Sequence, residues 1–77
     1  MILKEIFAVR LKELRLENNL NIPQFAQLLG VNIRLIKFYE NSKSKTLPTV
    51  DRLKQICIHL NCSADYLMGL SDTEKKS

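Results

Sequence analysis

Two short apolar patterns with the period of an α-helix meet at Gly30, and this arrangement constrains the fold more than any other feature of the chain. Asn21 is a good N-cap for the first pattern, with Pro23 in its first turn, and Asn32 is a good N-cap for the second. A glycine that follows a helix can adopt a positive φ angle at no steric cost. The residues expected to form the buried face of the first helix are Phe25, Ala26, Leu28 and Leu29. The sequence therefore predicts two short helices that are joined by a tight turn.

Three further helical patterns surround these two segments, and no strand pattern of comparable strength competes with them. One extends over residues 4–18, one begins after the cap Thr49, and the last begins after the cap Ser63. The residues expected to be buried in these three helices are Leu3, Phe7, Leu11 and Leu14, then Val50, Leu53, Ile56, Cys57 and Leu60, and finally Tyr66 and Leu67. The predicted fold class is all-α: a five-helix bundle with a central helix-turn-helix unit.

The chain has 77 residues, which is the size of one domain. We expect that domain over residues 1–70, followed over residues 71–77 by a polar tail or the boundary of the expressed segment. The two cysteines, Cys57 and Cys62, are too few and wrongly spaced for a disulfide framework or a zinc site, and buried reduced thiols indicate the cytoplasm. No apolar stretch approaches the roughly 18 residues of a membrane span, so no membrane partner is expected.

Positive charge is concentrated in the segment that follows the tight turn. Four cations stand there against one anion, Glu40, and the whole chain carries a net charge of +4. The four cations are Arg34, Lys37, Lys43 and Lys45. A local basic patch is typical of a protein that binds a polyanion, although a solvated basic surface gives the same pattern.

The segment "IRLIKFYE", residues 33–40, does not fit one simple amphipathic helix. At about 100° per residue, Ile36 and Tyr39 fall on one side and Arg34 falls on the other. Phe38 lies one turn from Arg34, on the charged side. The sequence therefore predicts an exposed phenylalanine on a basic helix face.

Five segments, in a fixed order and spacing, cover about residues 6–70. They read "FAVRLKELR", "LNIPQFAQLLGVN", "IKFYEN", "LPTVDRL" and "LNCSADYLMGL". Together they resemble the DNA-binding domain of the phage-repressor and Cro group, the Xre-type regulators. The resemblance implies a five-helix bundle of the phage-repressor type that binds double-stranded DNA, usually as a two-fold dimer. It also implies that the helix around residues 32–40 enters the major groove.

The resemblance implies roles for particular residues. Those at or near the positions that face bases are Ile33, Arg34, Lys37 and Phe38. Those at positions that hold phosphates are Asn21, Asn41, Lys43 and Lys45. A structural ion pair that joins the first helix to the end of the reading helix is implied between Arg10 and Glu40. The end of the domain that commonly forms the dimer contact contains Tyr66, Leu67, Met68 and Leu70.

Three positions depart from the family pattern. Ile22 follows the cap of the second helix, where the family very often has a glutamine that holds phosphate. Ile33 and Phe38 occupy reading positions but have no hydrogen-bonding group. Ile33 can pack on the preceding helix or touch a thymine methyl group. Phe38 can touch thymine methyl groups or form an exposed patch for a protein.

The sequence thus favours a sequence-specific, double-stranded DNA-binding transcriptional regulator, most simply a repressor that covers a promoter as a homodimer. The alternative is a protein-interaction module on the same fold, which uses Ile33 and Phe38 to bind a regulatory protein. We expect no enzyme activity, cofactor or metal. His59, Ser63 and Asp65 have the letters of a catalytic triad, but they crowd one helix end without an oxyanion feature.

Overall fold

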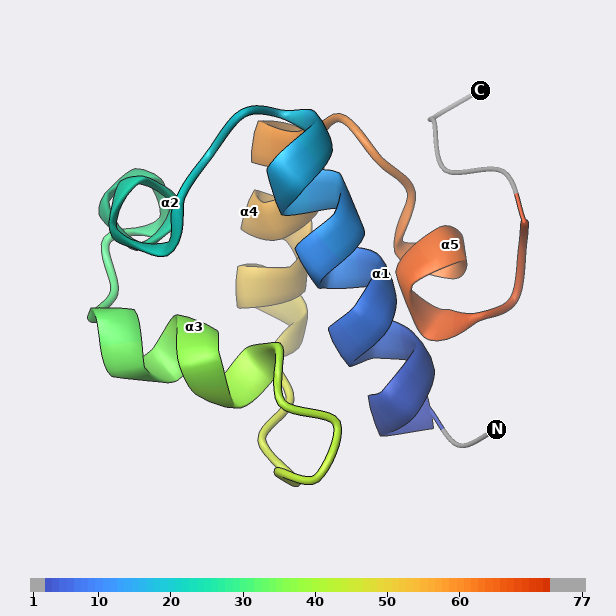
Figure 1. The fold of residues 1–77 in the computed structure, drawn as a ribbon. Helices are drawn as coiled ribbons and strands as arrows, with labels where there is room; N and C mark the ends of the chain where they lie inside the picture. Colours follow the sequence, from blue (N-terminus) through green and yellow to red (C-terminus); the bar gives the residue numbers. More distant parts are fainter. Residues whose placement is uncertain (1–2, 73–77) are drawn as a thin grey trace.

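The computed structural model describes residues 3–72, so the predicted polar tail lies outside the described residues from 73 onward. Within the described range the chain forms five helices and no strand (Figure 1). The helices are α1 (Leu3–Glu17), α2 (Ile22–Leu29), α3 (Ile33–Tyr39), α4 (Val50–Leu60) and α5 (Ala64–Met68). The predicted all-α, five-helix fold is confirmed.

The four helices after α1 begin at the N-caps that the sequence predicts, and α2 ends at the predicted glycine. Asn21 Oδ1 accepts a hydrogen bond from the Gln24 backbone N at 2.8 Å, and the Gln24 side chain accepts one from the Asn21 backbone N. Gly30 ends α2 with a φ angle of 69°, in the left-handed conformation. The N-caps of α3, α4 and α5 are Asn32, Thr49 and Ser63. These caps satisfy backbone groups at both ends of α2, so the turn into α3 has a defined geometry.

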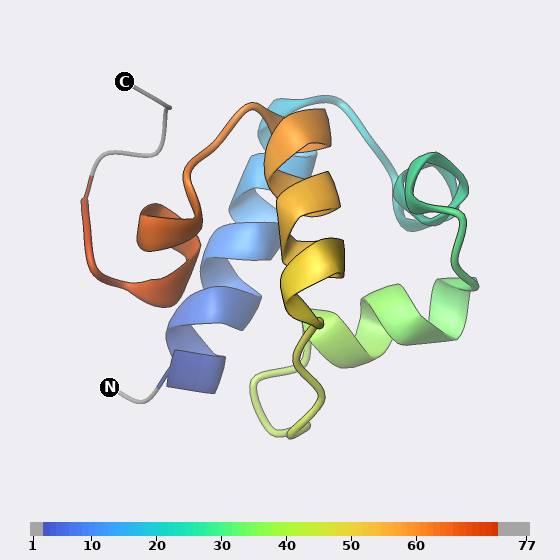
Figure 2. The same cartoon turned by 180° about the vertical axis from the view of Figure 1, so that it is seen from behind.

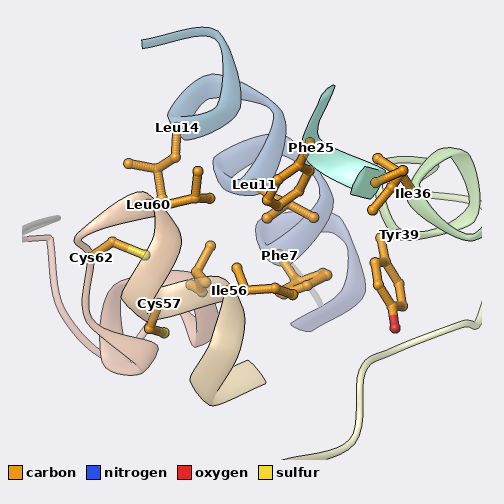
Figure 3. Packing of buried hydrophobic residues seen from close by; sticks show 12 residues of the cluster. Phe7, Leu11, Leu14, Phe25, Ile36, Tyr39, Ile56, Cys57, Leu60 and Cys62 are labelled. Carbon is orange, nitrogen blue, oxygen red and sulfur yellow. The ribbon is translucent and has the colours of Figure 1, made fainter. Parts of the chain in front are cut away.

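The α1 helix lies at the centre of the bundle. It packs against α5 and α3, while α2 packs against α3 and α4 (Figures 1 and 2). The buried cluster between the helices is built from side chains of all five (Figure 3). Its largest fully buried members are Phe7, Phe25, Leu11, Ile36, Ile56, Leu67 and Cys62. The α3 helix therefore has an inner side that joins this cluster and an outer side that lies at the edge of the molecule.

Three residues that we predicted to be buried lie at the surface, and one of them is Leu28 of α2, which is 46% exposed. Val50 is 84% exposed and Leu3 is 45% exposed. Both stand at the first position of their helices and line an open apolar hollow of about 210 Å³. The apolar stripe of each helix continues to its first residue, but the packing of the neighbouring helices covers only the later turns.

Gly69 provides a test of this packing, because it ends α5 with a φ angle of 83° and lies against α1. A Cβ atom there would lie 2.8 Å from Ile6 Cδ1. We expect Gly69→Ala to lower the free energy of unfolding by about 2–3 kcal/mol, since both the left-handed backbone and the contact with Ile6 oppose a side chain.

Gly30→Ala is the matched control for this prediction. Its φ angle is also positive, but a Cβ atom at Gly30 would meet nothing within 4 Å. Only the conformational cost of about 1–2 kcal/mol is expected there. Urea unfolding of the two variants measures the difference, and equal losses of stability would contradict the packing account.

Candidate nucleic-acid interface

The four residues predicted to lie at or near the bases share one side of α3. They are Ile33, Arg34, Lys37 and Phe38. At about 100° per residue, they fall within about 140° of the helix circumference. All four are exposed, and the apolar members Ile33 and Phe38 are 41% and 45% exposed. We call these four residues the outer face of α3.

The inner side of α3 fixes the direction in which this outer face points. Ile36 and Tyr39 are 0% and 3% exposed and belong to the buried cluster (Figure 3). The Tyr39 ring meets the Phe7 ring edge-on, with centroids 6.2 Å apart. Because burial of these side chains sets the rotation of α3, Phe38 is turned away from the core, as the sequence predicted.

The loop of residues 41–48 follows α3 directly, and the loop and α3 lie along the same edge of the molecule (Figures 1 and 2). Asn41, Lys43 and Lys45 are all exposed in it. Asn41 Oδ1 accepts a hydrogen bond from the Lys43 backbone N at 3.0 Å. The Asn41 side-chain oxygen therefore shapes the loop, and its amide NH₂ group is the part that could donate to a phosphate.

Asn21 lies at the N-terminus of α2, and its exposed side chain is used in a similar way. Its Oδ1 atom caps the helix by accepting from the Gln24 backbone N. A phosphate could therefore accept a hydrogen bond only from the Asn21 amide NH₂ group. Ile22, the next residue, packs against the buried cluster, so an apolar side chain fits a position where glutamine was the expected phosphate ligand.

Sequence reasoning missed Lys4, which is 7% exposed and reaches the end of α3. Its Nζ atom donates hydrogen bonds to the carbonyl oxygens of Phe38 (2.8 Å), Tyr39 (2.9 Å) and Thr46 (2.7 Å). Burial lowers the pKa of the Lys4 side chain from its ordinary value. Three simultaneous N–H donors are nevertheless available only from the charged ammonium group.

The predicted ion pair between Arg10 and Glu40 is wrong, because Glu40 pairs with Arg15. Arg15 Nε lies 2.7 Å from Glu40 Oε2, and Arg15 Nη2 lies 3.1 Å from Glu40 Oε1. Both side chains are buried, at 6% and 7% exposure. Arg15 follows Leu11 by one helical turn and so shares the buried side of α1, whereas Arg10 points elsewhere. The predicted link from the first helix to the end of α3 exists, with a different arginine.

Arg10 instead holds the segment after α5 against α1. Its Nη1 atom donates to the carbonyl oxygens of Tyr66 (2.6 Å) and Ser71 (2.8 Å). Its guanidinium carbon lies 4.2 Å from the centroid of the Tyr66 ring, and Nη2 lies 3.3 Å from Asp72 Oδ1. Arg10 thus stabilises the end of the domain and takes no part in positioning α3.

Leu67 does not belong to the surface that we predicted as the dimer contact. Leu67 is 0% exposed and belongs to the core of its own chain, so it cannot touch a second copy. Tyr66 and Met68 are partly buried, and Leu70 is 75% exposed. The apolar surface at this end of the domain is therefore dominated by Leu70.

Between residues 3 and 72, no three His, Cys, Asp or Glu side chains are placed so that they could hold a metal ion. None of the helices in this range is long and apolar enough to cross a membrane.

Comparison with known proteins agrees with the geometry. A family model described as helix-turn-helix matches residues 11–67, which is more than half of the chain and includes both α2 and α3. Neither the curated proteins nor the solved structures give a match to the chain. The chain belongs to the helix-turn-helix family, in its phage-repressor (Xre) type, a family of DNA-binding regulators.

Proposed function

We propose that the chain is a sequence-specific regulator of transcription that binds double-stranded DNA and acts as a repressor. The observation that carries this proposal is the outer face of α3, where two cations and two exposed apolar side chains lie together and lead into a basic loop. A helix of this kind fits the major groove of B-DNA, which is about 12 Å wide. A protein that fills the groove of a promoter blocks access to it, so repression is the simplest outcome.

The two kinds of side chain on the outer face make different contributions. Arg34, near the N-terminus of α3, can donate two hydrogen bonds to a guanine. Ile33 and Phe38 cannot donate hydrogen bonds, so they read thymine methyl groups by contact and shape. Around the helix, Lys37 lies between Ile33 and Arg34, where it neutralises a phosphate or reaches a base edge.

Phosphate contacts extend on both sides of α3. Lys43 and Lys45 approach the backbone from the loop, and the amide groups of Asn21 and Asn41 donate to it. Such contacts set the orientation of the protein on the duplex but carry no sequence information. In this proposal, the loop and the start of α2 provide affinity for DNA, and α3 provides specificity for its sequence.

A second function is favoured by one observation, which is the exposure of Ile33 and Phe38. Two exposed apolar side chains on one helix face also suit a protein partner. The basic loop favours DNA over this alternative, because its lysines attract a polyanion.

Binding to a duplex of random sequence tests the proposal directly. At low salt the protein should shift such a duplex in a gel, since phosphate contacts alone give non-specific binding. The shift should weaken steeply as salt is added. The absence of any shift at low salt would reject DNA binding and leave the protein-interaction module as the better account.

Lys45→Ala tests the role of the loop. If Lys45 contacts one phosphate, the variant should bind all sequences more weakly by a similar factor. The slope of log affinity against log salt should also fall by about one unit, because one fewer counterion is released. Lys12→Ala removes an exposed cation from α1 and is the matched control. If the two variants have the same slope, Lys45 is only a solvated loop residue.

Phe38→Ala tests the reading of bases by an apolar side chain. We expect the variant to lose about 1–3 kcal/mol of affinity for a selected operator, the value of one base contact. Non-specific binding and the melting temperature should stay nearly unchanged, because Phe38 is 45% exposed and lies outside the buried cluster.

Leu16→Ala is the control for Phe38→Ala, since Leu16 is an exposed apolar residue of α1 at 56% exposure. It should leave operator affinity unchanged. Operator affinity that is equally unchanged in Phe38→Ala would assign the outer face of α3 to a protein partner instead.

The proposed regulator binds as a homodimer, with Leu70 and the exposed parts of Tyr66 and Met68 at the contact. Two copies should occupy half-sites whose centres are about 34 Å apart, one turn of the duplex. Sedimentation of the operator complex should give two chains per site, and Leu70→Asp should reduce this to one without unfolding the chain. A wild-type complex with one chain per operator would contradict the dimer.

A further inference from the structure

We propose that Lys4 is a positioning residue for DNA binding, which holds the basic loop at a fixed place relative to the outer face of α3. This inference rests on the proposed function, since it concerns how the loop lysines meet phosphates. Lys4 itself lies in the first turn of α1 and is buried, so it does not touch DNA. It acts through the three carbonyl groups that its ammonium group binds.

The three acceptors come from the two segments that the proposal joins. Phe38 and Tyr39 are the last two residues of α3, and the Phe38 carbonyl also accepts a hydrogen bond from the Asn41 backbone N at 3.3 Å. Thr46 stands near the far end of the loop. One Nζ atom therefore closes the loop by holding its two ends within hydrogen-bonding distance of the same point.

The surroundings of the Lys4 side chain make this link stronger than a surface contact. Its Nζ atom lies 5.8 Å from the centroid of the Phe7 ring, inside the bundle. Hydrogen bonds from a charged donor are stronger than those from a neutral donor. Burial of a charged ammonium group costs free energy unless all of its hydrogen bonds are formed. The positive charge also suits the negative end of the α3 helix.

The other hydrogen bonds of the loop run within the loop or to the end of α3, where the Asn41 backbone N donates to the Phe38 carbonyl at 3.3 Å. The Lys43 backbone N donates to Asn41 Oδ1, the Ser44 backbone N donates to the Asn41 carbonyl, and the Thr46 backbone N donates to Ser44 Oγ. These bonds shape the loop, but none of them connects it to α1. The bond from Lys4 to Thr46 makes that connection, so it governs where Lys43 and Lys45 stand relative to Phe38.

The first experiment measures the mobility of the loop without DNA. Lys4→Met keeps an unbranched side chain of similar length and removes all three donors, while Lys12→Met removes one exposed cation from the same helix. In Lys4→Met the ¹⁵N order parameters of Lys43–Thr46 should fall from about 0.85 toward 0.6 or below, and in Lys12→Met they should not change. Unchanged order parameters in Lys4→Met would overturn the proposal.

The second experiment measures whether Lys4 acts through Lys45. Random-duplex affinity is compared for Lys4→Met, Lys45→Ala and the double variant in a double-mutant cycle. If Lys4 positions the loop, Lys45→Ala should cost less affinity in the Lys4→Met background, with a coupling of about threefold or more. An identical cost in both backgrounds means that Lys4 only stabilises the fold.

Failure of this inference and failure of the proposed function would give different results in these experiments. A wild-type chain that does not bind random duplex refutes DNA binding, while the order parameters still report whether Lys4 holds the loop. If Lys4→Met does not fold, both experiments are repeated with Lys4→Gln, whose shorter side chain has only two donors and so cannot bind all three carbonyl groups. The proposal is overturned if folded Lys4→Gln has the loop order parameters of the wild type and shows no coupling with Lys45→Ala.

Discussion

The buried ion pair between Arg15 and Glu40 is the interaction on which the exposed face of α3 depends. Glu40 directly follows α3, and two hydrogen bonds of 2.7 and 3.1 Å tie it to the last turns of α1. Arg15 also donates to the Leu20 carbonyl at 2.8 Å, so the same guanidinium fixes the turn before α2. Charges buried in this way are costly unless every partner is present, and loss of either one typically costs about 3–5 kcal/mol. The pair therefore works as a geometric constraint: it holds the entry to α2 and the exit from α3 in one place.

With both ends of the helix-turn-helix unit held, the burial of two side chains is enough to orient the rest of α3. Ile36 and Tyr39 turn inward, and the remaining side of the helix presents Arg34 and Phe38 to the outside. In the proposed function, a charged side chain and an apolar side chain on one helix face divide the reading of bases between them. In the same proposal, the loop lysines supply affinity that depends on salt, whereas the apolar contacts depend on the base sequence. The proposed function thus depends on a core that leaves one helix face uncovered.

The local features of this fold could be predicted from the sequence, because they depend on neighbouring residues. The caps at Asn21 and Asn32 and the positive φ angle of Gly30 are of this kind. The partners of the buried cations could not be predicted, since they come from distant parts of the chain. Lys4 and Arg15 follow the same 3–4 spacing as the buried stripe of α1, Phe7, Leu11 and Leu14, but a basic residue at the end of a stripe is ordinarily exposed. That spacing is the signal that would have favoured Arg15 over Arg10.

The most direct test of the whole account is a map of backbone amide shifts in the ¹⁵N-labelled chain as a duplex of random sequence is added at low salt. The account predicts that the largest shifts occur over residues 32–46, with a second, smaller group near Asn21, and that they vanish as salt is raised. Shifts concentrated on α4 and α5, around Ile58 and Leu70, would contradict it. They would mean that the uncovered face of α3 is not the surface that meets DNA.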